Sequence, residues 1–241
     1  VSNGTGTRAR PEAPSEECIE VGGIYIEYDQ NYGGGRPRKS YLRYENGFLF
    51  NRRNQVVDPN NISDEFVKIT YDFLQQMNGT DQGEKLLNEL SNSDNRYTIK
   101  NEYPVDKNGN PMKNAAQFNG ANGDLLLGYL MSPYNEYVKM VNIAHELFHA
   151  YQNHMGESGR YAEYEVEADL FAAGMAYTIS DESYEHMLGT MLDLDGTGIE
   201  YNNIMWKIIK NGNNNNDLPV MFQEAVNSDL KTHKQETHLK C

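Results

Sequence analysis

The amino-acid sequence predicts an α+β fold, with an N-terminal β-hairpin region that also contains helices and a helical C-terminal half. Two observations lead to this prediction. Short runs of β-branched and aromatic residues, separated by turn signals, occur before residue 51. Two long stretches, over about residues 136–154 and 160–179, contain a single glycine and no proline and have apolar residues at helical spacing.

The N-terminal residues differ in composition from the rest of the chain. Residues 1–17 consist of glycine, proline, serine and charged residues with almost nothing to bury, which is typical of a flexible lead-in or linker. Residues 18–241 are expected to form a single domain. The chain begins with Val1, as expected of a processed product or of a segment of a longer polypeptide.

The first structured elements are predicted to be strands. Residues 24–28 are rich in β-forming residues, so we expect a strand there. Residues 41–44 and 48–50 flank Asn46-Gly47, and this pair favours the tight turn of a β-hairpin.

Two helices are predicted after this hairpin. Ser63 is the expected N-cap of the first helix, whose apolar face carries Phe66, Ile69, Phe73 and Met77. The second helix is predicted over residues 81–90, because Asp81 and Glu84 have the spacing of a capping box.

The centre of the chain is predicted to contain strands and a long loop. Residues 97–100 are expected to form a strand, and the repeated Asn-Gly pairs of residues 101–123 indicate a loop. Residues 125–130 are expected to form an edge strand above the candidate site described below. Further helices are predicted at residues 181–192 and 218–226.

Composition excludes some classes of function. Lys and Arg total 21 against 35 Asp and Glu, and the net charge of −14 disfavours nucleic-acid and anionic membrane partners. No stretch approaches the roughly 18 consecutive apolar residues of a membrane span, so a soluble chain is expected. The two cysteines, Cys18 and Cys241, form no C-x-x-C pair, and whether they pair with each other is left open.

The predicted helix over residues 136–154 contains the sequence HELFH at residues 145–149. Positions i and i+4 lie one above the other on a helix, so His145 and His149 can present two nitrogen ligands to one Zn²⁺ ion. Glu146 is turned by about 100 degrees around the helix axis, beside the metal rather than on it. That is the place for a general base that takes a proton from metal-activated water.

A catalytic zinc site needs a third protein ligand, and the next predicted helix offers Glu163, Glu165 and Glu167. Glu165 shares a helix face with Ala168 and Ala172, whose small side chains allow two helices to approach closely. Glu163 and Glu167 are expected on a different, outer face, together with Leu170 and Phe171. Glu165 is therefore the predicted ligand.

Asp169 lies on the same helix face as Glu165. We expect its carboxylate to accept a hydrogen bond from a ligand histidine and to fix the tautomer of that ring. The group that stabilises the transition state is left open among Tyr161, Tyr164, Tyr177 and His186.

The sequence HELFHAYQ followed by EVEAD resembles the zincin metallopeptidases of the gluzincin type over about residues 138–176. The resemblance implies a zinc cofactor, with His145, His149 and Glu165 as ligands and Glu146 as catalytic base. The wider order of YENGFLF, GEKLLNEL, TIK and HELFHA is similar to the C-terminal metallopeptidase toxin domains of bacterial RHS-type polymorphic toxins and to related NleD-like effector peptidases. The chain itself contains no RHS repeat or core motif.

The motif and the resemblance together predict a zinc-dependent peptidase, and endopeptidase rather than exopeptidase activity is expected. The predicted partners are a protein or peptide substrate and, for a toxin or effector domain, a cognate inhibitor or immunity protein. Secretion or delivery by a bacterium is expected. The alternative is a catalytically silent zincin-like domain that binds a partner protein.

Overall fold

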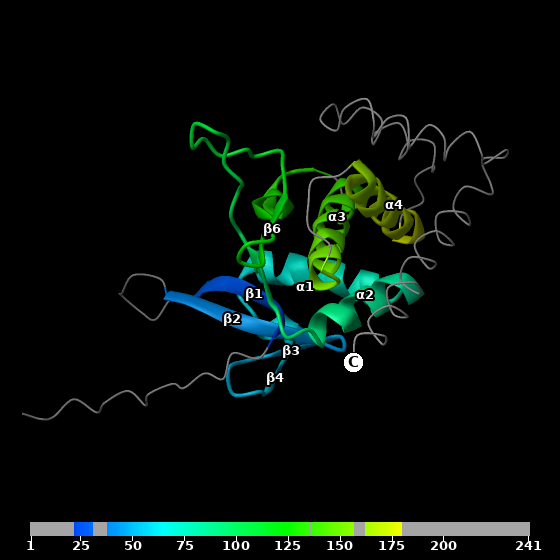
Figure 1. The fold of residues 1–241 in the computed structure, drawn as a ribbon. Coiled ribbons are helices and arrows are strands. Elements are labelled where there is room, and N and C mark those ends of the chain that lie inside the picture. The colour runs from blue at the N-terminus through cyan, green and yellow to red at the C-terminus, as the bar shows by residue number, and fades with distance from the viewer. Residues whose placement is uncertain (1–21, 31–37, 135, 157–161, 180–241) are drawn as a thin grey trace, which may run out of the picture.

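The computed structural model describes residues 22–30, 38–134, 136–156 and 162–179 (Figure 1). The lead-in predicted over residues 1–17, the helices predicted at residues 181–192 and 218–226, and both cysteines lie outside these residues. Within them, the protein has the predicted α+β fold: a mixed sheet comes first, and the helices that carry the HELFH sequence and Glu165 follow.

Seven strands form one sheet in the order β4-β3-β2-β1-β5-β7-β6. Their bounds are β1 (Gly23–Gln30), β2 (Arg38–Glu45), β3 (Phe48–Phe50), β4 (Val56–Val57), β5 (Arg96–Lys100), β6 (Gln117–Asn119) and β7 (Asp124–Leu126). Strand β5 is parallel to β1 and β7, whereas the other neighbouring pairs are antiparallel.

The predicted hairpin is confirmed. Strands β2 and β3 pair so that Glu45 lies opposite Phe48, with a two-residue turn between them. Both turn residues have positive φ, 49° at Asn46 and 81° at Gly47, as a type I′ turn requires. The turn therefore fixes the register of the hairpin.

Two helices connect the hairpin to β5. Helix α1 spans Glu65–Asn78 and helix α2 spans Asp81–Ser91. Both helices were predicted, but both caps differ from the prediction. Asp64, not Ser63, caps α1 by accepting from the amide of Val67, and Thr80 caps α2 by accepting from the amide of Gly83. The observed cap is adjacent to the predicted one in both helices and offers the same kind of oxygen, so composition alone could not fix the cap to one residue.

The strand nearest the candidate site differs from the prediction. Residues 101–123, predicted as a loop, contain β6, which forms the edge of the sheet. Residues 125–130 were predicted as an edge strand, but β7 lies between β5 and β6, and the chain continues into a 3-10 helix at Gly128–Met131. Three-residue strands leave little alternation in the sequence, which explains why β6 was missed.

Helix α3 spans Glu136–His154, as predicted, and helix α4 spans Ala162–Ile179. The two helices pack against each other, and Ala168 and Ala172 of α4 are fully buried. The helices lie on one side of the sheet (Figure 1), where the core-facing residues of the strands are buried with theirs. His154, at the end of α3, is 2.9 Å from Ser93 Oγ through its Nδ1, which ties α3 to the turn before β5.

Among the helices in the described residues, none is both long and apolar enough to cross a membrane.

Candidate metal centre

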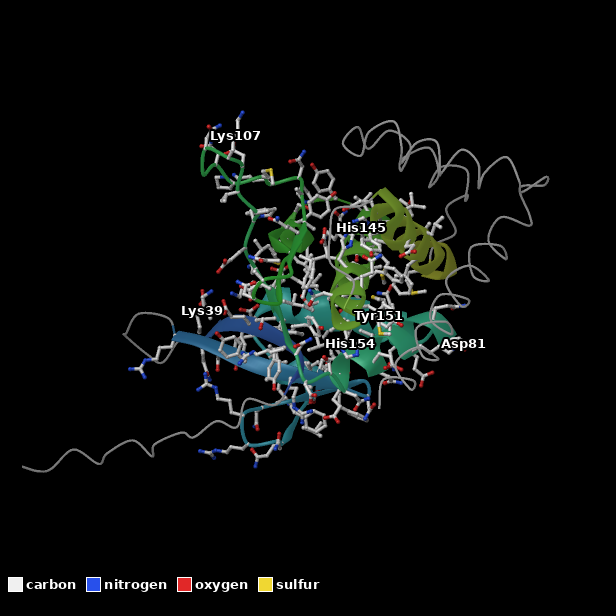
Figure 2. The ribbon with its side chains drawn as sticks, viewed as in Figure 1. Lys39, Asp81, Lys107, His145, Tyr151 and His154 are labelled. Carbon is white, nitrogen blue, oxygen red and sulfur yellow. The ribbon has the colours of Figure 1, made fainter. Side chains whose placement is uncertain are left out.

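Helix α3 brings two imidazole rings together. His145 and His149 lie one turn apart on the helix, and their Nε2 atoms are 2.9 Å from each other. The rings are nearly perpendicular, at 84°, with 4.5 Å between their centroids. His145 lies midway along α3 on the side of α4, well away from His154 (Figure 2). The helix thus presents both ring nitrogens to one point, as i, i+4 spacing requires.

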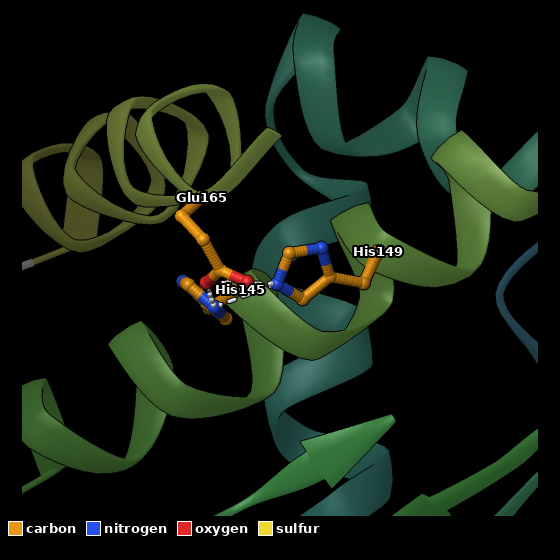
Figure 3. A group of neighbouring side chains, drawn as sticks. All are labelled: His145, His149 and Glu165. Carbon is orange, nitrogen blue, oxygen red and sulfur yellow. Dashed lines mark hydrogen bonds and ion pairs between the residues drawn. The ribbon is translucent and has the colours of Figure 1, made fainter. Parts of the chain in front are cut away.

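Helix α4 supplies a carboxylate at the same point. Glu165 Oε2 is 3.5 Å from His145 Nε2 and 3.4 Å from His149 Nε2 (Figure 3). In the described part of the chain, these three residues are the one group of three or more His, Cys, Asp and Glu side chains whose ligand atoms all lie within 4.8 Å of one another. Two helices that are separate in sequence therefore share one potential metal site.

The other ring nitrogen of each histidine contacts an oxygen. His145 Nδ1 is 2.7 Å from Asp169 Oδ1, and His149 Nδ1 is 2.8 Å from Gln152 Oε1. Neither a carboxylate nor an amide oxygen can donate, so both Nδ1 atoms carry the proton in these contacts. In the neutral rings, both Nε2 atoms then carry a lone pair and face each other and the carboxylate of Glu165.

This donor set fits a zinc ion. Three acceptor atoms that converge on one point repel one another, and a cation at that point relieves the repulsion. Two imidazole nitrogens and one carboxylate oxygen are ligands that zinc prefers. Bonds of about 2.0–2.1 Å in a tetrahedron separate neighbouring ligand atoms by roughly 3.3 Å, close to the distances from Glu165 Oε2 to the two Nε2 atoms.

The pKa shifts of Glu165 and His145 also indicate a site that favours positive charge. The neighbouring rings of His145 and His149 hold the pKa of Glu165 far below its usual value, so this side chain is an anion. Desolvation acts to lower the pKa of His145, but the hydrogen bonds with Asp169 and Glu165 outweigh it and raise this pKa well above its usual value. The carboxylates around His145 therefore favour positive charge at its ring, whether a proton or a metal ion supplies it.

Glu146 lies beside this point and is only 8% exposed. Its Oε2 accepts a hydrogen bond of 2.6 Å from the backbone amide of Phe118, in the edge strand β6. Burial raises the pKa of Glu146, and the nearby rings of His145 and His149 and the amide of Phe118 partly offset this. A buried carboxylate with a raised pKa is suited to accepting and returning a proton.

The other predicted site residues have different positions. Glu167 contacts Gln152 through its Oε2, at 3.0 Å, and not the histidines. The prediction that Leu170 and Phe171 share an outer face with it was wrong: both are buried, and the ring of Phe171 packs against that of Phe148 on α3. Of the residues considered for transition-state stabilisation, Tyr164 is half-buried, with its carbonyl 3.1 Å from Gln152 Nε2. The side chains of Glu163, Tyr161, Tyr177 and His186 lie outside the described residues.

Two groups in the site were not predicted from the sequence. Gln152 follows His149 by three residues and therefore lies on the same helix face, a spacing that could have indicated it. The amide of Phe118 could not have been found in this way, because it belongs to the backbone of a strand that the sequence did not predict.

Two histidines one turn apart, a glutamate beside them and a carboxylate from a neighbouring helix are the arrangement of an HExxH metallopeptidase. Comparison with protein families agrees: residues 54–171 match the model of peptidase family M91, described as an effector protein. The match supports a metallopeptidase effector domain over that segment, and the predicted resemblance to effector metallopeptidases is confirmed. No curated protein and no solved structure matches the chain.

The matched segment contains all the residues of the candidate site, from the strand β6 to Asp169. It begins after β3, so the hairpin and β1 lie before it, although they belong to the same sheet.

Proposed function

We propose that this protein is a zinc-dependent endopeptidase in which His145, His149 and Glu165 hold the metal and Glu146 is the general base. The observation that carries the proposal is the convergence of two Nε2 atoms and one carboxylate oxygen, with both Nδ1 atoms engaged by oxygens behind them. Such a set of acceptors has a clear use as a cation site and none as a packing contact.

In the proposed mechanism, a bound zinc ion supplies Lewis-acid chemistry for water activation and for polarising the scissile carbonyl. Glu146 accepts the proton of the attacking water and returns it to the leaving amine nitrogen as the C–N bond breaks. Because the amide of Phe118 holds Oε2 of Glu146, the second oxygen, Oε1, is the one that exchanges the proton. The raised pKa of Glu146 favours the uptake of the proton from water.

We also propose that the protein is delivered by a bacterium and acts on protein substrates, and that a cognate inhibitor or immunity protein protects the producing cell. The effector description of the matched family supports this context.

The test is zinc content together with turnover. We expect one zinc per chain by elemental analysis and cleavage of an unfolded protein into internal fragments. Glu146→Gln should keep the zinc and lose cleavage, because the amide of glutamine cannot accept the proton. Glu84→Gln, at an exposed position of α2, is the matched control and should cleave like the wild type.

Each other outcome has a distinct meaning. A wild-type protein without zinc would refute the metal site. Zinc without turnover on any unfolded substrate would favour the catalytically silent, partner-binding domain. Full cleavage by Glu146→Gln would refute the role of Glu146.

A further inference from the structure

Gln152 is a buried amide in the layer behind the metal-facing atoms. It is 4% exposed, and its side chain reaches residues of both helices. Its Oε1 lies 2.8 Å from His149 Nδ1, and its Nε2 donates to Tyr164 O at 3.1 Å and to Glu167 Oε2 at 3.0 Å. The amide thus connects a histidine of α3 to the first turns of α4.

The contacts on α4 determine which way the amide of Gln152 points. A backbone carbonyl and a carboxylate can only accept hydrogen bonds, so the NH₂ group of Gln152 must face Tyr164 and Glu167. The opposite orientation would place the amide oxygen against two acceptors. As a consequence, Oε1 must face His149.

The orientation of Gln152 in turn determines the tautomer of His149. An oxygen beside Nδ1 requires the proton on Nδ1, which leaves the lone pair on Nε2, the atom that faces His145 and Glu165. A reversed amide would offer NH₂ to Nδ1 and would favour the proton on Nε2. A histidine in that form cannot bind a metal through Nε2.

The same contacts hold the ligand helix in place. Glu165 lies between Tyr164 and Glu167 in sequence, and the side chain of Gln152 anchors the helix on both sides of it. Asp169 makes the corresponding link to His145 one turn further along α4. The two histidines are therefore oriented by different groups: Asp169 contacts His145 directly, and Glu167 acts on His149 through the amide of Gln152.

We infer that Glu167 and Gln152 form a positioning relay that holds His149 as the Nδ1–H tautomer and keeps Glu165 in register with the histidines. The inference rests on the proposed metal site. It adds two residues whose contacts described above are to Nδ1 of His149, to each other and to the backbone of α4, and not to the atoms that face the metal. Loss of such an outer contact typically costs about 10- to 100-fold in metal affinity.

The decisive experiment exchanges the two side chains of the relay. Gln152→Glu alone places a second carboxylate where the amide nitrogen now lies, 3.0 Å from Glu167 Oε2, and the two like charges repel. Gln152→Leu removes both the acceptor and the donor. In the double variant Gln152→Glu with Glu167→Gln, the carboxylate at position 152 accepts from both His149 and the new amide. Gln75→Leu is the control, because it removes a half-buried amide of α1 that lies away from the site and donates to Gly47 O in the turn between β2 and β3.

Zinc affinity is measured by competition with a chromophoric chelator, and the tautomer of His149 by ¹⁵N NMR of the metal-free protein at pH 8. We expect both single variants at position 152 to bind zinc about 10- to 100-fold more weakly and the control to match the wild type. The double variant should regain part of the loss, because Glu167→Gln removes one of the two acceptors beside position 152 and the carbonyl of Tyr164 remains. The metal-free wild type should show the Nδ1–H form, and Gln152→Leu should shift it toward Nε2–H.

Wild-type affinity and an unchanged tautomer in Gln152→Leu would overturn the relay. Failure of the double variant to regain affinity, with thermal unfolding like that of the single variants, would also overturn it. If the wild-type protein binds no zinc, the proposed function fails, and the tautomer of His149 in the metal-free protein still decides the relay.

Discussion

The hydrogen bond from the edge strand to Glu146 gives a prediction that a single substitution can test. The amide of Phe118 points to Glu146 and not into the ladder with β7. Proline lacks this amide and is tolerated on the open side of an edge strand, so Phe118→Pro removes the donor while leaving the sheet intact. The proline ring also occupies the space of the amide hydrogen and pushes the carboxylate of Glu146 away.

The expected magnitude follows from the burial of Glu146, which is 8% exposed and has its oxygen 2.6 Å from the amide nitrogen. A hydrogen bond to a charged group contributes about 1.5–3 kcal/mol. If this energy is lost from the transition state, kcat/KM falls by about 10- to 150-fold, since about 1.4 kcal/mol corresponds to a factor of ten.

The assay compares Phe118→Pro with Phe118→Ala, using a fluorogenic unfolded protein substrate and zinc analysis of both variants. The alanine variant keeps the amide but loses the ring, which lies 6.2 Å from that of Tyr97 between centroids. Both variants should retain zinc, because neither changes a proposed ligand. Equal kcat/KM values for the two variants would refute the view that the amide of β6 positions Glu146.

Two further predictions concern metal affinity and stability. Asp169→Asn should weaken zinc binding by about 10- to 100-fold, measured by chelator competition. The reason is that an uncharged amide, which can turn either way, replaces the carboxylate beside His145. Wild-type affinity in this variant would contradict the prediction. Burial raises the pKa of Tyr44 far above its usual value. Above pH 10, the unfolded chain therefore loses the phenol proton while the folded chain keeps it. The free energy of unfolding then falls as the pH rises. Between pH 10 and 11, the wild type should lose about 1 kcal/mol more unfolding free energy than Tyr44→Phe in urea titrations, and equal losses would contradict the argument.

Much of the fold could be predicted because its signals are local. Helix α3 was predicted with its observed bounds, since nineteen residues with helical periodicity and no glycine or proline leave no other choice. The hairpin of β2 and β3 was predicted from Asn46-Gly47, because these residues accept the positive φ of the turn. In both cases, the deciding interactions join residues that are close in sequence.

The arrangement of the short strands could not be predicted in the same way. The position of β7 inside the sheet and of β6 at its edge depends on pairing with β5 and on the parallel pairing of β5 with β1. These pairings join distant segments, and a strand of three residues has too few alternating positions to indicate its face. The contact between the amide of Phe118 and Glu146 depends on this arrangement, so the sequence could not predict it either.

At the candidate site, spacing predicted which side chains could meet but not what lies behind them. Helical geometry distinguished Glu165 and Asp169 from Glu167, and the structure gives these three residues different contacts. The contact of Glu167 with Gln152 joins two helices, so no spacing within either helix indicates it. Sequence periodicity describes one helix at a time, whereas the tautomer of His149 depends on both.

Three elements, α3, α4 and β6, supply and orient the residues of the candidate site. Helix α3 supplies both histidines and Glu146, and their relative positions follow from helix geometry alone. The ring orientations depend on α4, through Asp169 and through the relay of Glu167 and Gln152, and the orientation of Glu146 depends on β6. Asp169, Glu167 and the amide of Phe118 all contact α3 from other elements, so the HELFH helix alone lacks the groups that orient His145, Gln152 and Glu146. The packing of α4 and β6 against α3 is therefore a condition for the proposed chemistry.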